Sequence, residues 1–422
     1  MKSSKRLLAT SIAAACAAAP MSVFATNGDA LIGLGAQSRA LGGTGTAAFF
    51  GSENALSNPA LLGKSKGTEF AFGGTLFMPD VKSETNVSGA AASQTSKADT
   101  NIIPEVSMST RINDNLTFGI GMYGTAGMGV DYRDTAGLFN ATSSLQLMKF
   151  APTLAYNKGS FGVGIAPVIQ YGALDINYVN SSGTQGAGVA SDLGTGYNLG
   201  LYYDVNDSLT VALAYQSSID MKYKGQIVNA ADGFGIGTCG ACMGTITTDN
   251  MEQPAELKVG VAYTMSSWMV TADYKQIQWG SAKGYKAFNW KDQDVYAVGA
   301  KYSGEGYWLG AGYNHGKDPI KVLPSSQDAA GYSNQAVNMF NNHFFPGIVE
   351  DHFTFGGGIA LNKNMTLEGA VVYAGQVSKT INTGTISSYM GGAGFTGMPV
   401  DATTQKTTHS QVGYTISLRM NF

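Results

Sequence analysis

Two cysteines carry the clearest chemical signal in this sequence. Cys239 and Cys242 are spaced C-G-A-C, which permits a redox dithiol, a metal site or a disulfide. A redox dithiol needs a strand followed by the start of a helix, whereas these cysteines stand among glycines that predict a flexible loop. An oxidising compartment permits a disulfide between them, although the sequence does not decide whether the two cysteines are bonded, and we expect neither redox catalysis nor a bound metal.

Histidine chemistry has little support. The chain has four histidines, and they are His315, His343, His352 and His409. No motif places a serine or an aspartate beside one of them, and the Gly-x-Ser-x-Gly sequence of serine hydrolases is absent. The formal net charge of −3 and the lack of a basic patch argue against a nucleic-acid partner. We expect no enzymatic activity, no cofactor and no nucleic-acid binding.

Binding of an anionic head group is a stronger possibility. Four cations fall on the polar faces of predicted strands in which apolar and polar residues alternate. They are Arg111, Lys258, Lys275 and Arg419. A carboxylate removed from water needs a cationic partner, so these side chains are candidate contacts for the head group of a ligand. Glu256, Asp273 and Glu368 share the same faces, and ion pairs with these carboxylates are the alternative.

The first 25 residues predict a secretory signal peptide. A basic start at Lys2 and Arg6 precedes an Ala-rich apolar stretch over residues 7–19, and small residues favour cleavage after Ala25. The apolar stretch is too short and too rich in alanine to span a membrane well as a helix. We therefore expect residues 1–25 to be removed and the remainder to be exported.

The last residues predict a membrane-spanning strand. From 410 to 422, apolar side chains at even positions alternate with polar ones at odd positions, over a length that matches the ~9–11 residues of a tilted spanning strand. Only 13% of the chain is charged, against ~25% in average soluble domains. No stretch after Ala25 is long and apolar enough for a membrane helix, so a membrane protein of this sequence must be a closed barrel.

Fourteen segments show this alternation or a strand-like composition. They are 70–78, 105–112, 116–123, 145–156, 161–171, 194–203, 209–216, 256–265, 268–275, 296–302, 307–314, 352–361, 367–373 and 410–422. Short turns and long loops alternate strictly between them, as in an up-and-down barrel with tight periplasmic turns and long surface loops. The sequence therefore predicts an all-β fold, a 14-stranded antiparallel transmembrane barrel over 68–422. We place it in the Gram-negative outer membrane as a monomer, in contact with membrane lipid and lipopolysaccharide.

The segment 26–67 shows no strand alternation. It is rich in glycine and alanine and lightly charged. A fourteen-stranded barrel is too wide to be filled by the side chains of its own wall. We therefore expect this segment to form a plug inside the lumen.

Motifs in the plug resemble a known family. The run GLGAQSRALGGTG over 33–45 and the sequence Asn58-Pro59-Ala60 resemble the hatch of the long-chain fatty acid transporter (FadL-type) family of outer-membrane channels. Weaker similarities follow at 78–81, 219–225, 253–256, Trp279 and 375–376. The resemblance extends over essentially the whole mature chain. It implies passive uptake of hydrophobic compounds through a hatch-gated barrel, with a lateral exit near a kink in the third strand.

The resemblance also assigns roles to particular residues. Glycine within a strand often marks a bulge or bend, so Gly119, Gly121 and Gly124 are the candidates for the kink. Exposed apolar residues of the long loops are candidates for a surface groove that collects ligand, although they could equally pack the loops together. They are Leu138, Phe139, Phe234, Phe344 and Phe345.

The residues and the resemblance favour different ligands. Members of the family carry long-chain fatty acids or aromatic hydrocarbons such as toluene. Fatty acid carriers have basic residues in the region of the fifth strand, whereas residues 161–178 contain neither lysine nor arginine, which favours a neutral ligand. We nevertheless predict long-chain fatty acids, with neutral aromatic hydrocarbons as the alternative. A general porin is a more distant alternative, because the plug-like 26–67 argues against an open pore.

Overall fold

The computed structural model describes all residues except 1–26, 88, 241 and 245. The predicted signal peptide, residues 1–25, therefore lies outside the described residues. Among those described, no helix is both long and apolar enough to cross a lipid bilayer.

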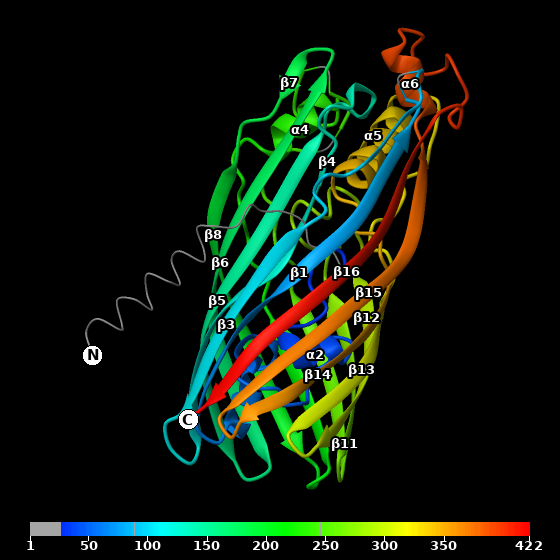
Figure 1. Ribbon diagram of the computed structural model, residues 1–422. Coiled ribbons are helices and arrows are strands. Elements are labelled where there is room, and N and C mark those ends of the chain that lie inside the picture. Colours follow the sequence, from blue (N-terminus) through cyan, green and yellow to red (C-terminus); the bar gives the residue numbers. More distant parts are fainter. Residues whose placement is uncertain (1–26, 88, 241, 245) are drawn as a thin grey trace, which may run out of the picture.

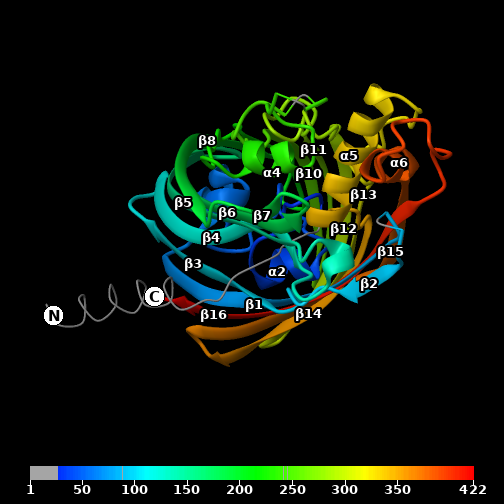
Figure 2. The same ribbon diagram turned by 90° about the horizontal axis from the view of Figure 1, so that it is seen from above.

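Within the described residues, fourteen long antiparallel strands close into one barrel (Figures 1 and 2). They are β1 (Thr68–Thr85), β3 (Asn101–Arg111), β4 (Leu116–Asp131), β5 (Thr142–Lys158), β6 (Phe161–Asn180), β8 (Ala190–Asp204), β9 (Leu209–Gln216), β10 (Glu256–Met265), β11 (Trp268–Ile277), β12 (Gln293–Gly304), β13 (Tyr307–Gly316), β14 (Asp351–Asn362), β15 (Met365–Asn382) and β16 (Thr404–Asn421). Each pairs with the next in this order, and pairing of β1 with β16 closes the barrel. The predicted fold is confirmed.

Alternation along the strands separates an apolar outer face from a lumenal face. In β5, Phe150 and Leu154 are exposed on the outside, while Lys149, Ala151 and Thr153 at the odd positions are buried toward the lumen. Large apolar side chains are exposed in the same way around the wall, which is the surface that lipid requires.

Several strands continue beyond the predicted segments on the loop side. β6 ends at Asn180 instead of 171, and β15 ends at Asn382 instead of 373. These extensions leave the apolar belt, so the alternation that reveals a spanning strand is lost there. In β4, residues 123–131 are all buried. Two short strands, β2 (Ala92–Thr95) and β7 (Gly183–Gln185), pair with extensions of this kind.

Helices of the long loops gather at one end of the barrel (Figure 1). They are η2 (Ala136–Leu138), α4 (Ile227–Gly233), α5 (Ala329–Phe344) and α6 (Gly384–Met390). The side chain of Asp328 caps α5 by accepting a hydrogen bond from the Gly331 amide at 2.7 Å. The opposite end carries the short turns and the C-terminus.

Residues 27–67, named here the N-terminal segment, lie inside the barrel (Figure 2). The segment contains α2 (Gly35–Ala40), α3 (Asn54–Ser57) and the 3₁₀ helix η1 (Pro59–Lys64). α2 packs against β13 to β16, and η1 packs against β4, β5, β6 and β8. The segment thus contacts both sides of the lumen and can present residues to any site within it.

Candidate functional site

A cavity lies between the N-terminal segment and the barrel wall. Residues 30–34 and 43–46 line it on one side, and polar residues of β5 and β9 to β13 line it on the other. Its free volume is about 80 Å³, well below the ~300 Å³ at which pockets for small organic ligands begin. A ligand of that size therefore does not fit the cavity in this arrangement of the N-terminal segment and the wall.

Three lysines line this cavity, namely Lys149 of β5, Lys258 of β10 and Lys275 of β11. Nζ of Lys258 lies 2.9 Å from a carboxylate oxygen of Glu256. Among the described residues, no hydrogen bond or ion pair is found for Lys149 or Lys275, although Lys149 is only 4% exposed. Lys149 and Lys275 thus line the cavity with ammonium groups that make no direct ion pair, and these groups are equipped to receive an anion.

The carboxylates around the cavity are already partnered. Asp273 accepts hydrogen bonds from the amides of Gly45 and Thr46, both at 2.9 Å, and so holds the N-terminal segment against β11. Asp29 accepts hydrogen bonds from Tyr285 and Gln253. Oδ1 of Asp29 and Oδ1 of Asp273 nevertheless have no hydrogen-bond partner among the described residues. A carboxylate that enters the cavity would therefore compete with these side chains for the lysines.

Two of the four predicted head-group cations do not line the cavity. The guanidinium of Arg419 is enclosed by the carboxylates of Glu53, Glu69 and Glu368. Arg111 donates to the backbone carbonyls of Gly63 and Ser65, where the N-terminal segment joins β1. Both arginines hold the N-terminal segment in place, whereas the structure brings Lys258 and Lys275 to the cavity as the strand alternation indicates.

Lys149 is the lysine that sequence reasoning missed. Its strand carries apolar residues on both faces, with Leu145 and Leu147 buried on the lumenal side and Phe150 outside. Odd positions of the strand share the face of Leu145 and Leu147, and this parity was the available signal that Lys149 points inward. The fifth strand of the barrel, β6, lacks a lysine or arginine over residues 161–178, and the neighbouring strand β5 provides Lys149 instead.

The Asn58-Pro59-Ala60 motif fixes the path of the N-terminal segment and does not line the cavity. Asn58 is fully buried, its Nδ2 donates to the Thr46 carbonyl at 2.7 Å, and its Oδ1 accepts from the Ala60 amide at 3.1 Å. The motif sits directly on Gly200 of β8, where a Cβ would lie 2.0 Å from Oδ1 of Asn58. Because Gly200 has no side chain and Asn58 forms a turn, the N-terminal segment can approach β8 closely at this point.

Replacing Asn58 by alanine is expected to loosen the N-terminal segment. The hydrogen bonds of the Asn58 side chain to Thr46 and Ala60 are lost, together with a longer one to the Leu201 carbonyl at 3.4 Å, and their backbone partners lose this side-chain contact at a cost of about 1–3 kcal/mol. Single-channel recordings in a planar bilayer should then show frequent transient conductance that the parent chain lacks. The matched control is Asn206→Ala in the exposed turn between β8 and β9, where Asn206 bonds only to its own turn. Equal conductance from both variants would contradict the role given to Asn58.

β4 is irregular directly after Gly124. Its register with β5 shifts between Gly124 and Ala126, which leaves Thr125 as a bulge. In the described residues, pairing of β3 with β4 ends at Glu105 and Tyr123, so the edge of β4 beyond this point lacks a β3 partner. The kink predicted at Gly119, Gly121 and Gly124 thus corresponds in position to a bulge at its last residue, while Gly119 and Gly121 pair regularly.

The N-terminal segment occupies the edge of β4 that β3 leaves free. The amide of Leu31 donates to the carbonyl of Thr125 at 3.1 Å, and the amide of Gly127 donates to the carbonyl of Asp29 at 3.0 Å. Thr125 also lines the lysine cavity. The cavity and the incompletely paired part of the wall are therefore separated only by residues around Asp29 to Leu31.

A second cavity of about 770 Å³ lies among the loops. Phe139 and Phe234 line it together with Tyr178, Tyr332 and Tyr389. The other predicted groove residues are buried behind it, and these are Leu138, Phe344 and Phe345. Of the five predicted groove residues, Phe139 and Phe234 thus border the cavity, while Leu138, Phe344 and Phe345 pack the loops together.

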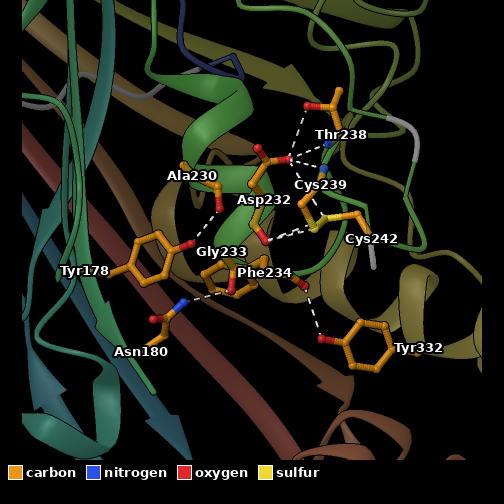
Figure 3. The surroundings of a disulfide bond; sticks show 10 residues. All are labelled: Tyr178, Asn180, Ala230, Asp232, Gly233, Phe234, Thr238, Cys239, Cys242 and Tyr332. Carbon is orange, nitrogen blue, oxygen red and sulfur yellow. Dashed lines mark hydrogen bonds between the residues drawn. A yellow bond between two sulfur atoms is a disulfide. The ribbon is translucent and has the colours of Figure 1, made fainter. Parts of the chain in front are cut away.

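Cys239 and Cys242 are joined by a disulfide beside this second cavity (Figure 3). The carboxylate of Asp232 accepts a hydrogen bond from the Cys239 amide at 3.0 Å, and it also accepts from the amide of Thr238. Asp232 and the two sulfurs lie close enough for a metal site, but sulfurs bonded to each other are not thiolate ligands. The disulfide and Asp232 together hold the loop that follows Phe234.

Together, the apolar outer belt, the occupied lumen and the two cavities define the class of protein. It is a closed outer-membrane β-barrel whose lumen contains its own N-terminal segment, with one cavity beside this segment and another among the loops. A family model described as "Outer membrane protein transport protein (OMPP1/FadL/TodX)" matches residues 10–329. The chain belongs to this family.

Individual relatives agree with this membership. The long-chain fatty acid transport protein of Escherichia coli O6:H1 is 24% identical over 356 residues, covering 72% of this chain and 79% of the relative. The corresponding protein of Escherichia coli K12 is 25% identical over 365 residues, covering 72% and 80%.

Solved structures show the same fold. The toluene transporter TodX of Pseudomonas putida has a TM-score of 0.65 at 18% identity, covering 93% of this chain and 99% of that structure. A FadL homologue from Pseudomonas aeruginosa has a TM-score of 0.69 at 13% identity, covering 94% and 100%. The predicted family, outer-membrane location and general function are confirmed, and the chain is a transporter of hydrophobic compounds in the Gram-negative outer membrane.

Proposed function

We propose that this channel takes up long-chain fatty acids by passive diffusion, with the carboxylate bound in the lumen by Lys149 and Lys275. The observation that carries this proposal is that the ammonium of Lys149, a residue only 4% exposed, borders the lysine cavity with no direct ion pair or hydrogen bond among the described residues. A carboxylate supplies the missing charge and forms charge-assisted hydrogen bonds with the ammonium groups. The E. coli relatives carry the name of long-chain fatty acid transport proteins, which supports the same ligand class.

In this proposal, residues 26–67 act as the hatch. The closed lysine cavity and the bonds of Asp29 and Leu31 to β4 support a closed resting state. Ligand collects at the aromatic loop cavity, moves to the lysines when the hatch shifts, and leaves through the wall beside the Thr125 bulge. The chain acts as a monomer in contact with membrane lipid and lipopolysaccharide, and it has no catalytic activity of its own.

Transport of neutral aromatic hydrocarbons is the second candidate. The aromatic side chains that border the loop cavity favour it, because aromatic rings pack well against one another in offset or edge-to-face arrangements. A general porin is not favoured, since the N-terminal segment occupies the lumen.

The deciding experiment is direct binding of oleate and of toluene to the purified chain in lipid nanodiscs, measured by calorimetry. We expect saturable oleate binding with weak or absent toluene binding. Toluene binding without oleate binding would replace the fatty acid assignment by the aromatic one. Binding of neither compound would overturn both.

A further inference from the structure

Asp29 is a buried carboxylate at the boundary between the lysine cavity and β4. Its Oδ2 accepts a hydrogen bond from Gln253 at 3.0 Å and another from the hydroxyl of Tyr285. Its Oδ1 is buried and has no hydrogen-bond partner among the described residues. The carboxylate is thus held on one side only, in a place where water cannot complete its solvation.

The backbone around Asp29 covers the free edge of β4. The Asp29 carbonyl and the Leu31 amide bind β4 on either side of Ala126, within the stretch that has no β3 partner in the described residues. The Asp29 side chain therefore interacts with charged groups of the cavity, while its backbone carbonyl binds the free edge of β4.

The docked position of this part of the segment is narrowly defined. Gly28 has a φ of 68°, and a Cβ at this position would lie 2.8 Å from the rings of both Trp279 and Trp290. These rings contact each other with centroids 5.0 Å apart. Close packing of Gly28 against the two tryptophan rings leaves little room for a shifted position of residues 27–31. We therefore treat the segment as having two states, one docked on β4 and one released from it.

The charges around Asp29 make the docked state sensitive to an added anion. Lys149 attracts the Asp29 carboxylate, Glu256 repels it, and Tyr285 and Gln253 donate to it. Burial outweighs the attractions and raises the pKa of Asp29 to about 6. A second carboxylate bound at Lys149 would take up the cation that favours ionised Asp29 and would add a repulsive charge beside it.

We propose that Asp29 is the gating residue of this channel: a ligand carboxylate bound at Lys149 expels the Asp29 carboxylate, and residues 27–31 then leave the edge of β4. The wall beside the Thr125 bulge opens, and the bound molecule can pass into the membrane. This inference rests on the proposed function, because it requires a ligand with a carboxylate.

Asp29→Asn tests this role. The neutral amide has the same shape and can still accept hydrogen bonds from Tyr285 and Gln253, but it is not repelled by an incoming anion. We expect the variant to bind oleate more tightly than the parent chain, because the repulsion between Asp29 and the ligand is removed, while oleate uptake into liposomes falls by at least about tenfold, within the usual range of coupling between two sites. A matched fall in binding and uptake would contradict a gating role.

Disulfide trapping reports on the segment itself. Ala30 and Ala126 face each other across the antiparallel bridge, so the double variant Ala30→Cys with Ala126→Cys should cross-link only in the docked state. Oleate should slow cross-linking in this background, whereas oleyl alcohol, which lacks the carboxylate, should not. Adding Asp29→Asn should remove the effect of oleate.

The outcomes separate the two proposals. If oleate does not bind the parent chain, the proposed function fails. If oleate binds but slows cross-linking equally with and without Asp29→Asn, the fatty acid assignment stands and the gating role is overturned. Should Asp29→Asn fail to assemble, the comparison of oleate with oleyl alcohol decides alone, because equal slowing of the cross-link by both compounds would overturn release triggered by a carboxylate.

Discussion

The Lys149→Ala variant is expected to bind oleate about 10- to 100-fold more weakly than the parent chain, because a hydrogen bond to a charged group contributes about 1.5–3 kcal/mol. Lys149 is only 4% exposed and borders the cavity, and its ammonium makes no direct ion pair or hydrogen bond among the described residues. A carboxylate bound there would lose its main cation in the variant. Calorimetric titration with oleate in nanodiscs measures the change.

Two controls make this result specific to the head group. Lys64→Ala removes a lysine whose ammonium lies 2.6 Å from the carboxylate of Asp204, away from the lysine cavity, and should change oleate affinity by less than about twofold. Toluene has no carboxylate, so any toluene binding should be the same in Lys149→Ala and in the parent chain. Unchanged oleate affinity in Lys149→Ala would remove the head-group role of this lysine.

The barrel could be predicted from the sequence because lipid and lumen impose opposite demands on successive residues. In β10, Val259, Val261 and Tyr263 face lipid, and this alternation also placed Lys258 correctly on the lumenal side. Where strands rise above the membrane, as in β4 after Gly124, no such demand exists and the pattern disappears.

The functional roles of the cations were less accessible than their direction. Alternation gives the face on which a side chain lies but not its partner. Arg419 points inward as predicted, yet its partners Glu53 and Glu368 come from the N-terminal segment and from another strand. Lys149 was hidden for the opposite reason, since its lumenal neighbours Leu145 and Leu147 made that face look apolar. Pairings across the lumen depend on how the segment folds back, which no local pattern encodes.

The Arg419→Gln variant is expected to dislodge the N-terminal segment. Arg419 is 6% exposed and is the shared ion-pair partner of Glu53 in the segment, Glu69 in β1 and Glu368 in β15. Removing it leaves three buried carboxylates to repel one another, and breaking a buried ion pair in this way costs about 3–5 kcal/mol. Planar-bilayer recordings should show a persistent open conductance, and urea unfolding in lipid should show lower stability than the parent chain.

Companion variants identify the cause of the expected opening. Arg419→Lys keeps the positive charge but cannot reproduce the contacts of a guanidinium with two Glu53 oxygens, at 2.9 and 3.0 Å, so it should give an intermediate conductance. Adding Glu53→Gln to Arg419→Gln removes the one repelled carboxylate that belongs to the segment, and the double variant should be more closed than Arg419→Gln alone. Such a rescue means that repulsion of Glu53 displaces the segment. Without it, Arg419 acts by holding β1, β15 and β16 together, and the segment opens only because the wall around it has weakened.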